Sequence, residues 1–120
     1  LADRMEDIRP CISCHNGPTL GGQSFEYADL KADYFKGRKL TDGDKGLEAF
    51  SKQAKDSKRF KVPSLRNLQL TAPYMHDGSI ATINEAVASM LRCQVGVPVN
   101  DNEVAQIVDF LCTLTPQATP

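Results

Sequence analysis

Cys11-Ile12-Ser13-Cys14-His15 is the stretch of this sequence that most strongly constrains its fold. A Cys-x-x-Cys-His segment is the attachment signature of a c-type haem, in which both thiols form thioethers with the porphyrin. One helical turn separates the two sulfurs, so they reach neighbouring vinyl groups, and the following residue lies beneath the ring centre. We therefore expect Cys11 and Cys14 to attach one haem c and His15 to be the proximal iron ligand.

Two other kinds of site contain a Cys-x-x-Cys pair, namely redox dithiols and zinc sites. A dithiol usually accompanies a βαβ pattern, and no such pattern is visible in the sequence. A zinc site needs two more ligands at short spacing, whereas His76, Cys93 and Cys112 are scattered. The histidine directly after the second cysteine favours haem attachment over both alternatives.

The length of 120 residues corresponds to one domain, residues 1–120, or to part of a larger protein. Hydrophobic residues make up 41% of the chain, enough for a modest core, and a haem would add apolar surface for it to wrap. A net charge of −1 implies no nucleic-acid partner, and no apolar stretch is long enough to span a bilayer.

Haem attachment to thiols normally takes place outside the cytoplasm, so we expect a periplasmic protein. The start at Leu1 without an initiator methionine fits removal of a leader or excision from a longer polypeptide. Basic residues dominate from Lys31 to Lys61, and acidic residues dominate from Asp77 onward, opposed only by Arg92. This asymmetry is either an ordinary solvated surface or a dipolar surface that steers a redox partner.

Helical periodicity dominates the second half of the chain. Thr82 with Glu85 three residues later forms a capping box and predicts a helix from residue 83. A second amphipathic helix begins near Asn100 or Asp101 and ends before Pro116. Weaker helical segments are predicted over residues 1–10, 27–35 and 47–56, with an extended stretch over 60–67 and a helical turn at Ser64.

No alternating strand pattern is visible, so the predicted class is all-α. The long loops between the helices would be unusual in a small domain without a cofactor. We therefore expect a cytochrome c-like domain whose loops wrap around one covalently attached haem.

The sixth iron ligand has four candidates: Met5, Met75, Met90 and His76. Met5 lies too close before the haem motif to reach the far face. We favour Met90, because it precedes the terminal helix by a short loop, as distal methionines often do in small c-type cytochromes. The competing interpretation is a core methionine at helical spacing; Met75 is the second candidate ligand and His76 the third. A thioether ligand raises the reduction potential and predicts a high-potential carrier.

Cys93 and Cys112 remain after haem attachment. In an oxidising compartment they could form a disulfide between the last two helices. Two buried, unpaired thiols are the alternative, and the sequence leaves both open.

A longer pattern extends beyond the haem motif. The segment Phe60-Lys61-Val62-Pro63-Ser64-Leu65-Arg66-Asn67, with the following Leu70-Thr71-Ala72-Pro73-Tyr74-Met75-His76-Asp77-Gly78-Ser79, resembles bacterial dihaem cytochrome c peroxidases and the related MauG proteins. The likeness continues at residues 82–87, Met90, 107–111 and 114–115, and upstream at residues 11–17 and 21–22. It is greatest to the C-terminal haem domain of that family, which accepts electrons and passes them to a second, peroxidatic haem.

This resemblance implies roles for several residues. It makes Met90 the distal ligand and places His76 near the haem edge, where its protonation could affect redox behaviour. It also implies a calcium ion between two haem domains, with backbone oxygens at positions matching Thr71 and Pro73 and the remaining ligand from the other domain. This chain has one Cys-x-x-Cys-His motif and no tryptophan, so it is not a complete dihaem peroxidase and offers no tryptophan bridge between haems.

Three functions are consistent with these features. The favoured one is an electron-transfer domain with His15 and Met90 as ligands, whose partner is a redox protein or a second haem domain. The alternative is a haem peroxidase that reduces hydrogen peroxide, which needs an acid/base group above the iron, with His76 as the obvious histidine. The third is a sensor in which a gas displaces Met90.

Overall fold

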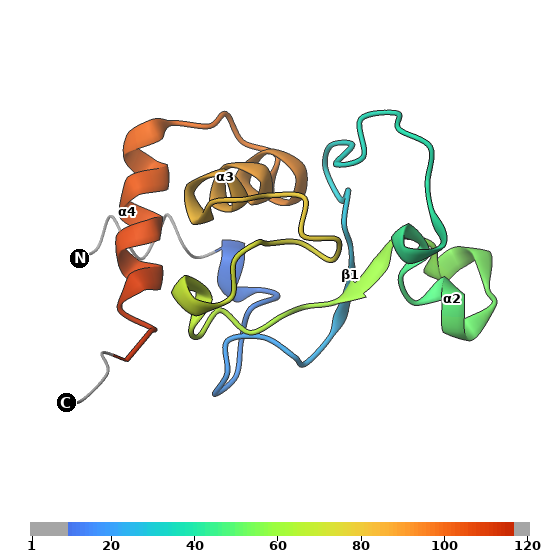
Figure 1. The fold of residues 1–120 in the computed structure, drawn as a ribbon, viewed down its shortest axis with the longest axis horizontal. Coiled ribbons are helices and arrows are strands. Elements are labelled where there is room, and N and C mark those ends of the chain that lie inside the picture. The colour runs from blue at the N-terminus through green and yellow to red at the C-terminus, as the bar shows by residue number, and fades with distance from the viewer. Residues whose placement is uncertain (1–9, 117–120) are drawn as a thin grey trace.

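The computed structural model describes residues 10–116, which form a mostly helical domain with long loops (Figure 1). The predicted helix over residues 1–10, which includes Met5, lies almost wholly outside the described residues, and residues 10–12 are helical. In chain order the helices and strands are β1 (Phe25–Tyr27), α2 (Glu48–Ser51), β2 (Arg59–Lys61), α3 (Ile83–Met90) and α4 (Asp101–Cys112). Short 3₁₀ helices span Asp42–Lys45, Ala54–Asp56 and Leu68–Leu70, and a π-helical turn spans Leu91–Val95.

The two predicted C-terminal helices are confirmed, as is Thr82 as the N-cap of the first. The Thr82 hydroxyl accepts a hydrogen bond from the Glu85 amide at 3.2 Å, at the start of α3. The Asn100 side chain accepts from the amides of Asn102 and Glu103, at the start of α4. Each cap satisfies amides that the first helical turn leaves without an intrahelical partner.

The hydrophobic core lies between α3 and α4. Its buried residues are Val87, Leu91, Val104, Ile107 and Leu111. These residues recur at intervals of three or four positions, so each helix presents one apolar stripe to the other. Leu68, at the start of the neighbouring 3₁₀ helix, and the preceding Leu65 pack against this core.

A two-stranded antiparallel ribbon, absent from the prediction, connects the core to the rest of the domain. Phe25 pairs with Lys61, and Tyr27 pairs with Arg59. The all-α prediction is therefore wrong in this detail, and turns and bends replace the helix predicted over residues 27–35. Strands of three residues are too short to show an alternating pattern, which explains why the sequence did not reveal them.

The middle of the chain also departs from the predicted elements. The segment that begins at Phe60 is extended as predicted, but the helical turn expected at Ser64 forms at Leu68–Leu70. Helix over residues 47–56 is confined to the short α2 and a following 3₁₀ turn. Weak periodicity in this region therefore located helical turns without giving their bounds.

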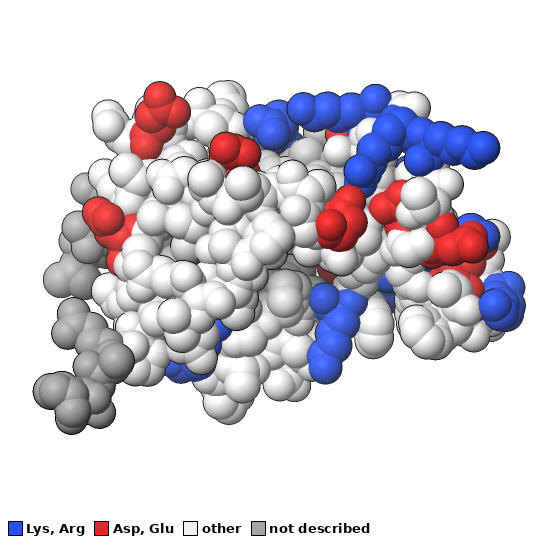
Figure 2. Space-filling view, in the orientation of Figure 1, with Lys and Arg blue, Asp and Glu red and all other residues white. Residues whose placement is uncertain are grey.

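Charges are unevenly distributed over the surface. Figure 2 shows most Lys and Arg side chains over the half that contains β1 and α2, with several acidic groups among them, whereas the α4 half shows acidic groups and few basic ones. Some of these charges are paired, as in Lys58 with Asp29 and Arg59 with Asp56. Among the described residues, no helix is long and apolar enough to cross a bilayer.

Candidate haem site

The Cys-x-x-Cys-His motif forms one helical turn. Residues 10–12 are helical, and the His15 amide donates to the Cys11 carbonyl at 2.8 Å. Both thiols are unpaired and half-buried. The turn therefore has the local geometry that was expected for attaching two neighbouring groups of one porphyrin.

The His15 ring is held in one orientation by two backbone carbonyls. Its Nδ1 atom lies 3.0 Å from the Pro63 oxygen and 3.3 Å from the Leu20 oxygen. Because carbonyl oxygens only accept hydrogen bonds, Nδ1 carries the proton and the lone pair is on Nε2. Among residues 10–116, no group hydrogen-bonds Nε2. A ring fixed through one nitrogen, with the other free, is the usual arrangement of a metal-binding histidine.

Burial also keeps His15 neutral. Desolvation lowers the pKa of His15 below its usual 6.5, and the hydrogen bonds to Pro63 and Leu20 offset part of this effect. A neutral imidazole is the form that binds a metal, so the site needs no deprotonation of His15 at neutral pH.

The segment that orients His15 is itself held by close backbone packing. The Gly22 amide donates to the Val62 carbonyl at 2.6 Å, and the Leu65 amide donates to the Leu20 carbonyl at 3.2 Å. Gly21 is buried with φ +152°, and a Cβ atom there would lie 2.0 Å from the Pro63 oxygen. Only glycine fits at this contact, which accounts for one of the two adjacent glycines in the sequence.

Two observations bear on the other two interpretations of the motif. Burial raises the pKa of the Cys11 thiol, and the neighbouring Cys14 contributes in the same direction. Reactive dithiols instead have a thiol whose pKa is lowered. Within the described part of the chain, the ligand atoms of Cys11, Cys14 and His15 do not cluster within the 4.8 Å that joint binding of a single metal ion would need.

Met90 lies at the end of α3, where the helix changes into the π-helical turn. It is half-buried and does not belong to the α3–α4 core, which uses Val87 and Leu91. Met90 instead shares a helical face with Ala86 and Cys93, at spacings of four and three residues. Its assignment as distal ligand stays a prediction, as does the second choice, Met75, a half-buried loop residue with φ +71°.

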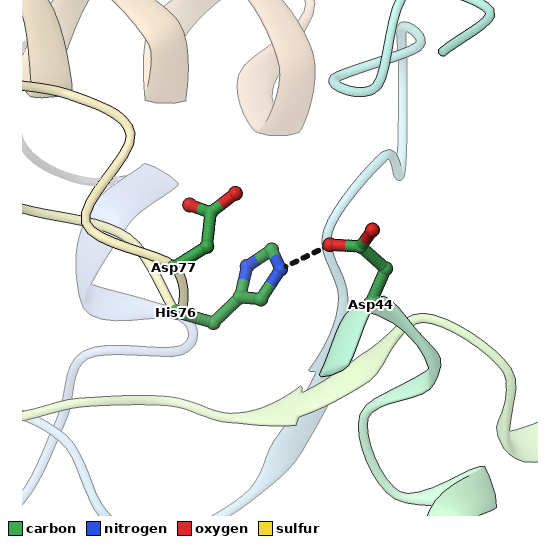
Figure 3. Close-up of side chains that lie close together, drawn as sticks. All are labelled: Asp44, His76 and Asp77. Carbon is green, nitrogen blue, oxygen red and sulfur yellow. Dashed lines mark hydrogen bonds and ion pairs between the residues drawn. The ribbon is translucent and has the colours of Figure 1, made fainter. Parts of the chain in front are cut away.

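The structure brings His76 close to two acidic residues, Asp44, which is distant in sequence, and Asp77, which follows it directly (Figure 3). Its Nε2 atom lies 2.7 Å from Oδ1 of Asp44, toward which the ring points. The His76 ring also stacks on Phe60 with 4.4 Å between ring centroids. Its side chain is 17% exposed although the residue as a whole is exposed, and the two contacts described above fix the position of the ring.

Asp44 is buried and strongly hydrogen-bonded. Its Oδ2 atom accepts from the Thr41 amide at 2.8 Å and from the Thr41 hydroxyl at 3.0 Å. Hydrogen bonds from the Thr41 amide and from His76 lower the pKa of Asp44 from 3.8 to about 2. Asp44 is therefore ionised at neutral pH.

Asp44, His76 and Asp77 have potential ligand atoms within 4.8 Å of one another. The positive charge beside these carboxylates, however, is that of an arginine side chain. The Arg38 guanidinium lies 3.0 Å from the Asp77 carboxylate and 3.7 Å from that of Asp44. These charges compensate one another, so the cluster is a hydrogen-bonded network that fixes His76. The predicted position of His76 near a haem edge stays a prediction.

Two further predicted features concern calcium binding and a disulfide. Thr71 and Pro73 are both exposed in the loop before His76, and their role as backbone ligands of calcium stays a prediction. Cys93 is buried and Cys112 half-buried, and both thiols are unpaired in the structure. The disulfide left open by the sequence is therefore not formed here.

Sequence reasoning missed the groups that orient the site. The Pro63 carbonyl lies 48 positions from His15, and Asp44 lies 32 positions from His76. No local pattern marked Asp44, which is one acid among many basic residues.

Comparison with known proteins gives these features a family context. No family model matches the chain. Over 110 residues it is 46% identical to cytochrome c peroxidase Ccp of Escherichia coli (strain K12), a match that covers 92% of the chain and 23% of that protein. Over 105 residues it is 43% identical to cytochrome c551 peroxidase of Nitrosomonas europaea, and this match covers 88% of the chain and 30% of that protein.

A solved structure agrees with the sequence matches. The crystal structure of a MauG-like protein associated with microbial copper homeostasis superposes with a TM-score of 0.73 and 28% identity, covering 99% of this chain and 47% of that one. The chain spans less than a third of the length of the two peroxidases described above. Over most of its length the chain is therefore homologous to the family of dihaem cytochrome c peroxidases and MauG proteins, and it corresponds to one part of their longer chains.

Proposed function

We propose that residues 1–120 form a single electron-transfer domain that carries one haem c, attached through Cys11 and Cys14 and ligated by His15 and Met90. When bound, the haem supplies one-electron redox chemistry at its iron. The chain supplies attachment, ligand orientation and a partly apolar environment.

The orientation of His15 is the observation that carries this proposal. Its Nδ1–H donates to the Pro63 and Leu20 carbonyls, which leaves Nε2 as the nitrogen with the free lone pair, and the thiols of Cys11 and Cys14 in the same motif are unpaired. The backbone contact at Gly21 keeps the Pro63 oxygen in place. An imidazole fixed in this way binds iron without reorientation, which favours rapid electron transfer over ligand exchange.

Met90 supports the same function from its position outside the α3–α4 core. A half-buried thioether that packs in no core cluster is available as a soft ligand, and such a ligand raises the reduction potential. With His15 and Met90 both holding the iron, electron transfer would need little rearrangement of the protein. We therefore favour a high-potential carrier with no substrate pocket of its own.

Peroxide reduction is the second candidate, because the relatives named above are peroxidases. In this chain His76, the obvious acid/base histidine, is hydrogen-bonded to Asp44 and stacked on Phe60. That engagement favours a structural or tuning role for His76. Peroxidase chemistry would then belong to a second haem domain or to a partner, to which this domain passes electrons.

The partner and the location follow from the same chemistry. The half of the surface rich in Lys and Arg suits a redox protein with an acidic face (Figure 2). Covalent haem attachment favours a periplasmic location. Calcium at the Thr71 and Pro73 carbonyls would need a ligand from another domain.

The experiment that tests the proposal compares Met90→Ala with Met75→Ala in the haem-loaded protein. Loss of the thioether ligand removes the sulfur-to-iron charge-transfer band of the oxidised protein and lowers the reduction potential. We expect both changes in Met90→Ala and neither in the matched Met75→Ala variant. An unchanged band in Met90→Ala refutes the ligand assignment, and a high-spin wild-type spectrum with rapid peroxide reaction favours the peroxidase.

A further inference from the structure

The end of the helix that carries Met90 is capped by a loop more than sixty residues away in sequence. The Gln94 side chain donates through Nε2 to the Tyr27 carbonyl at 2.6 Å and accepts through Oε1 from the Leu30 amide at 3.1 Å. The Cys93 carbonyl accepts from the amides of Lys31 and Ala32 at 2.7 and 3.1 Å. Four hydrogen bonds therefore join the π-helical turn to the loop of residues 27–32.

These hydrogen bonds satisfy backbone groups at the end of the helix. The last carbonyls of a helix have no intrahelical partner and must be satisfied by other groups. Gly96, with φ +79°, turns the chain so that its own amide and that of Val97 return to the Leu91 carbonyl. The Cys93 carbonyl, also in this last turn, accepts hydrogen bonds from two amides of the loop.

The loop also makes close van der Waals contact with the helix end. A Cβ atom at Gly96 would lie 3.0 Å from Cβ of Lys31. Gln94 is half-buried and uses both ends of its amide, so its side chain has one productive orientation. The helix end thus cannot shift along its axis without breaking several contacts together.

The same loop connects to the proximal side through the ribbon. It follows β1, which pairs with β2 in the register Tyr27 with Arg59. One residue beyond β2, the Val62 carbonyl binds the Gly22 amide, and the next carbonyl, that of Pro63, accepts from His15. A continuous hydrogen-bonded path therefore runs from His15 through the ribbon to Gln94, four residues after Met90.

From this path we propose that Gln94 is a positioning residue, which clamps the helix end onto the loop of residues 27–32 and so fixes the position of Met90, the residue that would supply the second iron ligand. The inference rests on the proposed function, because it concerns the distal ligand named there. The β1–β2 ribbon links the segment that carries His15 to the segment that carries Met90, so the positions of these two residues are coupled. If the Gln94 hydrogen bonds were lost, Met90 would be displaced from the haem iron more easily, and added ligands would bind there in its place.

The test measures displacement of the Met90 thioether by imidazole in the oxidised haem-loaded protein, followed by loss of the charge-transfer band. Gln94→Leu removes both side-chain hydrogen bonds while keeping a similar size. Gln94→Glu retains an acceptor for the Leu30 amide, loses the donor to Tyr27 and serves if the first variant folds poorly. Gln106→Leu, on the exposed face of α4, is the matched control.

We expect Gln94→Leu to bind imidazole roughly tenfold more tightly than wild type, because two hydrogen bonds that favour the closed state are gone. Gln94→Glu should show a change in the same direction, and Gln106→Leu none. Hydrogen exchange at the Leu30, Lys31 and Ala32 amides should accelerate in parallel, which reports on the clamp without using the haem.

The outcomes separate the two proposals. A wild-type protein that shows the band, with imidazole affinity and amide exchange unchanged in both Gln94 variants, overturns this inference and leaves the proposed function standing. Faster exchange with unchanged imidazole affinity also overturns it, because the clamp would then be structural only. A wild-type protein that lacks the band overturns the assignment of Met90 and this inference together.

Discussion

Gly21→Ala should destabilise the protein at the contact that orients His15. The added Cβ would lie 2.0 Å from the Pro63 oxygen, and the residue has φ +152°. Backbone strain of about 1 kcal/mol and overpacking of roughly 2 kcal/mol predict a loss of about 3 kcal/mol in the free energy of unfolding. Urea unfolding followed by far-ultraviolet circular dichroism measures this loss, with the slope m expected to stay constant.

Gly37→Ala is the control that separates strain from overlap. Gly37 has φ +73°, and no atom lies within 4 Å of the place that an added Cβ would take, so strain alone should cost about 1 kcal/mol. The difference between the two variants, about 2 kcal/mol, then measures the contact with Pro63. Equal losses in the two variants would refute the view that a tight backbone contact holds the Pro63 carbonyl against His15.

Three further changes test other parts of the structure. Leu111→Ala, in the α3–α4 core, should cost about 3 kcal/mol in urea unfolding, and a loss below about 1 kcal/mol would contradict that packing. Asn100→Ala should cost about 1 kcal/mol because it removes the N-cap of α4, whereas Asn102→Ala should cost little. Because the folded pKa of Asp44 is lowered to about 2, its stabilising contribution is present above pH 3.8 and is lost as the pH falls toward 2. Asp44→Asn should therefore show a flatter fall in melting temperature over that range, and a slope equal to wild type would argue against the Asp44 hydrogen bonds.

Signals that act over a few residues were read correctly from the sequence. The Cys-x-x-Cys-His segment forms the helical turn that its local spacing predicted. The predicted cap at Thr82 forms because its side-chain oxygen and the Glu85 amide, whose hydrogen bond it accepts, lie three positions apart. The resemblance to the peroxidase and MauG family was confirmed because it rests on a long run of residues rather than on composition.

Contacts between distant segments could not be read from the same sequence. The ribbon pairs Phe25 with Lys61, and Gln94 reaches Tyr27 across 67 positions. Each strand is too short to leave a periodic pattern, and a single glutamine carries no local signal of its partner. Backbone carbonyls such as that of Pro63 leave no trace in the sequence, although they decide how His15 is oriented.

The most direct test of the central claim is mass spectrometry of the polypeptide purified from cells that assemble c-type cytochromes. We expect one haem covalently added to the intact chain, located on the peptide that contains Cys11 and Cys14. An unmodified mass, or a haem mapped to Cys93 or Cys112, would contradict that claim.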